Sequence, residues 1–135
     1  MKVNALDHVN IVSDDVPGTA RFYAELLGLD ARDGPSPMMK PEQVRWLYNE
    51  AGHPVIHLNQ RGVFQVYERD SRPGPTTGAV HHVAFNCSGF GQMQERLRQR
   101  GLDFKVNGVP SIGLNQIFLV DPNGVLLELN FYEAA

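Results

Sequence analysis

The 135 residues of this chain are enough for one domain with a substantial core, and its 42% hydrophobic and 20% charged residues are ordinary for a globular protein. A formal net charge of -3 argues against a nucleic-acid partner, because such proteins usually carry a basic stripe. A single cysteine excludes an intramolecular disulfide, and the lack of a long apolar run argues against a membrane span and favours a cytoplasmic protein.

The chain begins with a pattern typical of a strand followed by a helix. Alternating residue types predict a strand over Ala5–Val12, with His8 and Asn10 on one face. Ser13–Asp15 then offers N-cap residues for a helix that runs to about Leu27. We expect this helix to end at Gly28, since glycine is common just past a helix end.

Residues 30–43 form a proline-rich loop whose Met38 and Met39 suit an adaptable flap or, equally, a mobile surface loop. Strands are predicted over Val44–Tyr48 and Pro54–Gln60 as a hairpin, and over Val63–Tyr67 as an extension of the same sheet. Residues 69–78 contain Pro and Gly in a short run and predict a hinge. We therefore divide a single domain, 1–135, into module one (1–68), the hinge (69–78) and module two (79–135).

The second module repeats the order of the first. A strand is predicted over Ala79–Asn86 and a helix over Phe90–Arg100, which Gly101 ends. Cys87 follows that strand, where a buried, unreactive thiol is expected. Three strands complete the module, over Asp103–Asn107, Asn115–Val120 and Val125–Phe131. Since neither half can cover its own sheet, we predict an α+β fold of two tandem βαβββ modules, forming a curved, partly closed sheet around a cleft with helices outside.

An internal repeat places metal-binding residue types at matching positions. Leu6–Ile11 is echoed by Val80–Phe85, and His53–Asn59 is echoed by Gly124–Asn130. The overlay puts His82 on His8, 74 residues apart, and Glu128 on His57, 71 residues apart.

These four side chains, His8, His57, His82 and Glu128, would form a site of three imidazoles and one carboxylate. Such a set suits one divalent transition metal, namely Zn, Ni, Co, Fe or Mn, rather than Ca. A single strand histidine is more often structural than a ligand, but a carboxylate flanked by leucines needs a compensating cation. We exclude His81, which would point to the opposite face of its strand from His82, and expect His53 to be exposed at a turn.

The chain resembles the vicinal oxygen chelate superfamily, which includes glyoxalase I, fosfomycin-resistance proteins, bleomycin-resistance proteins and extradiol dioxygenases. The resemblance covers nearly the whole chain, and four motifs carry it: Asp7–Ile11, Phe22–Leu29, His82–Phe85 and Phe118–Leu129. It implies paired βαβββ modules around a metal, often in a homodimer. It also implies that His8, His82 and Glu128 are metal ligands, and that His57 occupies a fourth position, which bacterial glyoxalase I fills with Glu.

The resemblance leaves three functions open. The first is a glyoxalase-like lyase or isomerase acting on a small substrate with vicinal oxygens, with the metal as Lewis acid and Glu128 as catalytic proton shuttle. The second is an Fe(II)-dependent extradiol-type dioxygenase, although Phe118 and Val109 stand where its signature has Tyr and His. The third is a non-enzymatic ligand-binding or metal-binding module. Arg45 and Trp46 are candidate substrate-binding residues, as an anchor for a carboxylate and an aromatic wall.

Overall fold

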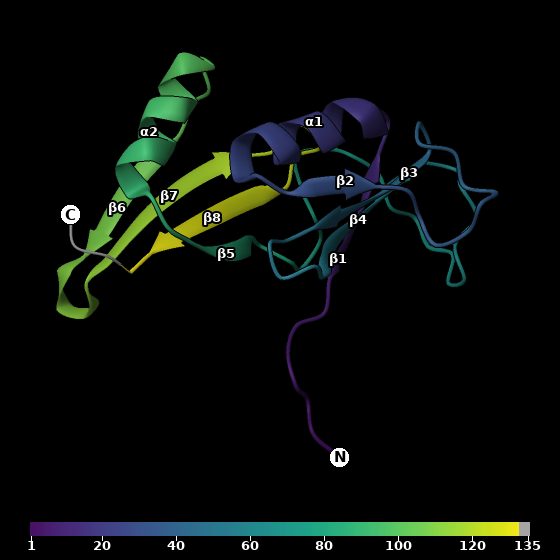
Figure 1. Cartoon of the computed structure of the whole chain (residues 1–135), viewed down its shortest axis with the longest axis horizontal. Coiled ribbons are helices and arrows are strands. Elements are labelled where there is room, and N and C mark those ends of the chain that lie inside the picture. Colours follow the sequence, from purple (N-terminus) through teal and green to yellow (C-terminus); the bar gives the residue numbers. More distant parts are fainter. Residues whose placement is uncertain (133–135) are drawn as a thin grey trace. The chain divides into compact units, whose positions relative to one another are not determined.

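The computed structural model describes residues 1–132 and divides the chain into two units, Met1–Pro73 and Gly74–Ala135. Each unit has its own four-stranded mixed sheet and one α-helix (Figure 1). The division falls between Pro73 and Gly74, inside residues 69–78. No helix among the described residues is long and apolar enough to cross a membrane.

The first unit contains β1 (Val9–Ser13), α1 (Val16–Leu27), β2 (Asp30–Arg32), β3 (Val44–Tyr48) and β4 (Pro54–Gln60). Its strands lie in the order β1-β4-β3-β2, with β1 parallel to β4 and the other pairs antiparallel. The Asp15 side chain caps α1 by accepting a hydrogen bond from the Gly18 amide at 3.0 Å. Gly28 ends α1 with a φ of 71°, which glycine adopts without strain.

Three predictions for this unit are wrong. The first strand begins at Val9 rather than Ala5, so His8 lies one residue before it. The segment 30–43 includes a short strand, β2, which pairs with β3. Val63–Tyr67 forms no strand, because its backbone donors are used locally: the Val63 amide bonds to the Gln60 carbonyl, and the Gln65 amide bonds to the Glu68 carboxylate.

The second unit repeats this plan with β5 (Val83–Cys87), α2 (Phe90–Gln99), β6 (Lys105–Val109), a 3-10 turn (Pro110–Ile112), β7 (Leu114–Val120) and β8 (Leu126–Phe131). The strand order β5-β8-β7-β6 matches that of the first unit. The predicted strand over Ala79–Asn86 begins four residues late, at Val83, whereas β6, β7 and β8 lie within two residues of prediction. Asp121 organises the β7–β8 turn by accepting from the amides of Asn123 and Val125.

Each sheet has one buried apolar face and one polar face. In the first unit, Leu47, Ile56 and Leu58 are at most 1% exposed, as are Tyr23 and Leu26 of α1. Because side chains alternate along a strand, Trp46, His57 and Asn59 lie on the other face.

The second unit buries a corresponding set of side chains, Leu97, Ile117, Leu127, Leu129 and Phe131. Alternation again leaves polar side chains on the opposite face of the sheet, among them Gln116, Glu128 and Asn130. The predicted α+β class, with two tandem βαβββ modules, is confirmed.

Candidate metal centre

Three aromatic rings stack at the β1 end of the first unit. His8 immediately precedes β1, His57 lies in the middle of β4, and Trp46 is its register partner on β3. The His8 and His57 ring centroids are 3.7 Å apart with planes inclined by 12°. Those of Trp46 and His57 are 3.8 Å apart with planes inclined by 7°. His57 is thus held between two rings by its place in the sheet.

The Nε2 atom of His57 is buried and has no hydrogen-bond partner among residues 1–132. Burial, and to a smaller extent the neighbouring His8, lower the pKa of His57 from 6.5 to about 4. The ring is therefore neutral near pH 7. A neutral imidazole with an unpaired buried nitrogen is suited to bind a metal ion, because it has a lone pair to offer and gains the partner it lacks.

Asp7 and His53 surround His8. The Nδ1 atom of His8 donates to the Asp7 carboxylate at 2.7 Å, and this hydrogen bond is the main cause of a lowered Asp7 pKa. The Nε2 atom of His53 donates to the Asp7 carbonyl at 2.8 Å and lies 3.3 Å from its carboxylate. With Nδ1 of His8 occupied, Nε2 is the nitrogen left for a metal. As predicted, His53 is exposed.

The second unit brings His82 and Glu128 together. The Nε2 atom of His82 lies 3.1 Å from Oε2 of Glu128, whose side chain is only 13% exposed. The Gln116 amide donates to the other oxygen, Oε1, and also to Asn130 Oδ1 at 3.2 Å. Asn107 donates in turn to Gln116 Oε1 at 2.7 Å. Glu128 therefore has a polar contact on each carboxylate oxygen.

Sequence reasoning missed Asp7 and Gln116 as supporting residues. Asp7 could have been found, because it is the direct neighbour of a predicted ligand. Gln116 gave no local signal, since its contact with Glu128 depends on the pairing of β7 with β8.

The prediction that His81 points to the opposite face of a strand from His82 is wrong, whereas its exclusion as a metal ligand stays a prediction. Residues 81 and 82 precede β5, so strand alternation does not apply to them. Their Nδ1 atoms are 3.0 Å apart, and their ring centroids are 5.3 Å apart. His81 is consequently a neighbour of the His82 side chain rather than a residue of the opposite face.

Of the two predicted substrate-binding residues, only Trp46 lies beside a predicted ligand. Arg45 follows Val44 and precedes Trp46 on β3, so it projects from the other face of the sheet, the face of its register partner Leu58. Its Nη1 donates to Asp33 at 2.9 Å. The structure therefore does not bring Arg45 to the His57 side chain.

The four predicted ligands form two pairs, one in each unit: His8 with His57, and His82 with Glu128. Over residues 1–132, no group of three or more His, Cys, Asp and Glu side chains is arranged to hold a metal ion. Each unit thus supplies half of the predicted set.

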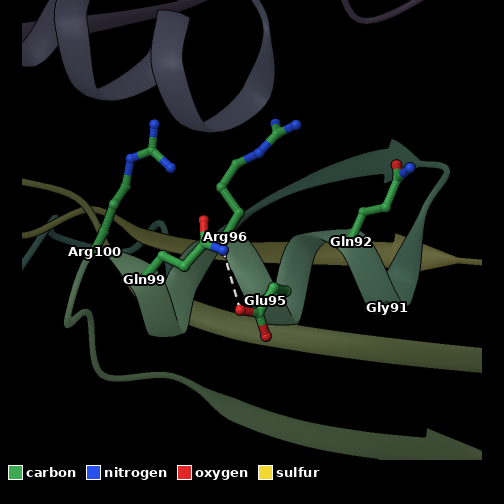
Figure 2. A pocket seen from close by; sticks show the side chains of 6 residues that line it. All are labelled: Gly91, Gln92, Glu95, Arg96, Gln99 and Arg100. Atoms are coloured by element: carbon green, nitrogen blue, oxygen red, sulfur yellow. Dashed lines mark hydrogen bonds between the residues drawn. The ribbon is translucent and has the colours of Figure 1, made fainter.

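A hollow of about 560 Å³ runs along α2 and is lined by Gly91, Gln92, Glu95, Arg96, Gln99 and Arg100 (Figure 2). These side chains come from successive turns of one helix, and Gln99 donates to Glu95 at 3.1 Å among them. None of the predicted site residues lines this hollow. It therefore gives no support to the metal centre.

Comparison with known proteins points to one family. The model of the Glyoxalase/Bleomycin resistance protein/Dioxygenase superfamily matches residues 5–129. A protein named "Glyoxylase I 4" from Arabidopsis thaliana is 25% identical over 136 residues, covering 96% of this chain and 71% of the relative.

Solved structures of low sequence identity share the fold. A protein from the mobile metagenome of V. pseudocholerae has a TM-score of 0.71 at 22% identity, covering 98% of both chains. A lactoylglutathione lyase from Agrobacterium tumefaciens has a TM-score of 0.69 at 16% identity, covering 96% of this chain and 95% of that one.

Proposed function

Because this chain belongs to the Glyoxalase/Bleomycin resistance protein/Dioxygenase superfamily, also called vicinal oxygen chelate, we propose that it is a divalent-metal-dependent lyase or isomerase. Its substrate would be a small molecule with vicinal oxygens. The relatives named as a glyoxylase and a lactoylglutathione lyase support this reaction type. The observation that carries the proposal is the buried His57 Nε2, which has no partner among the described residues.

The residues fit a metal ion of the Zn, Ni, Co, Fe or Mn group. Each unit contributes two potential ligands at positions matched by the internal repeat, giving His8, His57, His82 and Glu128. Three imidazoles and one carboxylate form a donor set that such ions accept. When bound, the ion would act as a Lewis acid on two neighbouring oxygens of the substrate.

Glu128 is the proposed catalytic residue. Its Oε1 accepts a hydrogen bond from Gln116, so Oε2 would serve as the ligand atom and, when displaced from the ion, as the atom that takes a proton from substrate and returns it. Acid–base help of this kind contributes about 10²- to 10⁴-fold to a rate. Trp46 would form an aromatic wall beside His57, which limits access of water to that side of the site.

An Fe(II)-dependent dioxygenase is the second candidate, and the stacking of His57 is the observation that favours it. Held between His8 and Trp46, the His57 ring can serve as packing instead of as a ligand. His8, His82 and Glu128 would then form the two-histidine, one-carboxylate triad of non-haem iron oxygenases.

We also propose a homodimer. Members of the superfamily act on small molecules and commonly form oligomers. A dimer offers two ways of completing the four-ligand set, with the two pairs supplied by one chain or by two. Size-exclusion chromatography with light scattering, with and without metal, tests this directly.

Metal binding is the first experiment. Trp46 is the single tryptophan of the chain and stacks on His57, so its fluorescence reports on that ring. Titrating metal-free protein with Co(II), Ni(II) or Zn(II) should change the fluorescence and saturate near one ion per chain. Glu128→Gln should weaken binding far more than Glu95→Gln, a matched change at an exposed glutamate of α2, or His81→Ala.

The reaction type is tested next. With metal, a lyase or isomerase of this kind should exchange carbon-bound hydrogen of small hydroxycarbonyl compounds, such as dihydroxyacetone, in D₂O. Oxygen uptake with Fe(II) and catechols would instead support the dioxygenase. Failure to bind any divalent ion near stoichiometry would contradict both enzymes and leave the non-enzymatic ligand-binding module.

A further inference from the structure

A row of amide side chains crosses the polar face of the second sheet and ends on Glu128. Asn107 on β6 is the register partner of Gln116 on β7, and Gln116 is the partner of Asn130 on β8. Glu128 lies two residues from Asn130 on the same strand and therefore on the same face. The row thus joins three strands to one predicted ligand.

Every hydrogen-bonding group of the Gln116 amide is engaged. Its nitrogen donates to Glu128 Oε1 and to Asn130 Oδ1, and its oxygen accepts from Asn107 Nδ2 at 2.7 Å. An amide has an N–H₂ group that donates and a carbonyl oxygen that accepts, and both groups are engaged here. The Glu128 carboxylate only accepts, so it sets which way the Gln116 amide points, and the Gln116 oxygen then accepts from Asn107.

The consequence for Glu128 is that its two oxygens are not equivalent. Oε1 is held by Gln116, while Oε2 lies 3.1 Å from Nε2 of His82. For a metal ion that binds His82, Oε2 would be the available oxygen of Glu128, because Oε1 already accepts a hydrogen bond from Gln116. A carboxylate bound through one oxygen leaves a coordination position free and is more easily displaced than one bound through two.

We propose that Gln116 is a positioning residue that makes Glu128 a single-oxygen metal ligand, with Asn107 holding the oxygen of the Gln116 amide in place. The inference rests on the proposed metal-binding function. A test of the role of Gln116 must also distinguish this inference from a purely structural amide row, which would stabilise the sheet without affecting the coordination of a metal.

The test uses Co(II), whose visible absorption reports coordination number and geometry, together with calorimetric affinities on the full chain. Gln116→Met keeps the length of the side chain and removes the amide. Gln99→Met is the matched control, because Gln99 also donates to a glutamate of the same unit, at 3.1 Å on the outer face of α2 (Figure 2). We expect about 10- to 100-fold weaker binding and an altered spectrum for Gln116→Met, the usual effect of removing a residue that orients a ligand. Gln99→Met should match wild type in both.

Asn107→Ala provides a second test, because Asn107 is exposed and, in the described part of the chain, is linked to Glu128 through Gln116 alone. It should weaken Co(II) binding less than Gln116→Met does. Combined with Gln116→Met, it should cause no further loss of Co(II) affinity. If Gln116→Met does not fold, Asn107→Ala carries the test by itself.

Wild-type affinity and spectrum in Gln116→Met and Asn107→Ala, even with lowered melting temperatures, would overturn the inference and leave the proposed function standing. Absence of Co(II) binding by the wild type would overturn both.

Discussion

Replacing Asp7 with Asn tests whether His8 is a metal ligand oriented by its neighbour. The change keeps the size of the side chain and removes the charge of the carboxylate that accepts from His8 Nδ1 at 2.7 Å. An amide in this place can turn its N–H₂ group toward His8, which would favour the wrong tautomer of the ring. We expect weaker metal binding without loss of the fold.

The structure sets the size of the effect. Removing a residue that orients a metal-binding histidine typically weakens metal affinity about 10- to 100-fold. The side chain of Asp7 is 70% exposed, so water can partly replace it, and we expect the lower limit, about tenfold. His53→Ala removes the hydrogen bond to the Asp7 carbonyl and should have a smaller effect in the same direction.

Asp33→Asn is the matched control for this experiment. Asp33 is also in the first unit, is 71% exposed and pairs with Arg45 Nη1 at 2.9 Å, on a strand face away from His57. Calorimetric titration of both variants and wild type with Zn(II) measures the affinities, and Trp46 fluorescence follows the same event at the His57 ring. Equal affinities for Asp7→Asn, Asp33→Asn and wild type would refute the role of Asp7 and weaken the assignment of His8.

Three further predictions concern the metal-free chain. Burial and the neighbouring His8 lower the pKa of His57 to about 4 in the folded chain. As the pH falls, the His57 ring is therefore protonated near pH 6.5 in the unfolded chain but only near pH 4 in the folded chain. Stability should therefore fall as pH drops from 6.5 to 4, and His57→Gln should flatten that slope in urea titrations; parallel slopes would contradict it. Burial raises the pKa of the Cys87 thiol to about 11, so Ellman's reagent should label it slowly in the folded chain at pH 8 and quickly in urea. Fast labelling of the folded chain would contradict this prediction, because it would show an accessible thiolate. Leu129→Ala, at a fully buried position, should lower the free energy of unfolding by about 2–5 kcal/mol. Val120→Ala, at a 58% exposed position, should lower it by about 0.5 kcal/mol. Similar losses for the two variants would contradict the assigned sheet faces.

The sequence predicted the candidate ligands of the site but not the residues that surround them. The internal repeat indicated His8, His57, His82 and Glu128, because matched positions in two similar modules can be compared along the chain. Whether these four residues bind one ion stays a prediction. The stack of His57 between His8 and Trp46 could not be predicted, since it depends on the register of β4 with β1 and β3.

The fold itself followed from local signals to a large extent. Asp15 and Gly28 bound α1 because capping and the left-handed conformation are properties of single residues. The same holds for the strand alternation of β3 and β4, whose limits match the prediction. Local chemistry, repeated in the two halves, therefore determined the α+β class and the order of elements.

Tertiary structure decided what local pattern could not. Val63–Tyr67 alternates like a strand but uses its amides in turns, whereas Asp30–Arg32 has little strand character and becomes β2 by pairing with β3. Gln116 acquires its role only when β7 pairs with β8 and places its amide on Glu128. The physical reason is common to all three: pairing between strands is a contact between distant residues, and its free energy depends on partners that the local sequence does not specify.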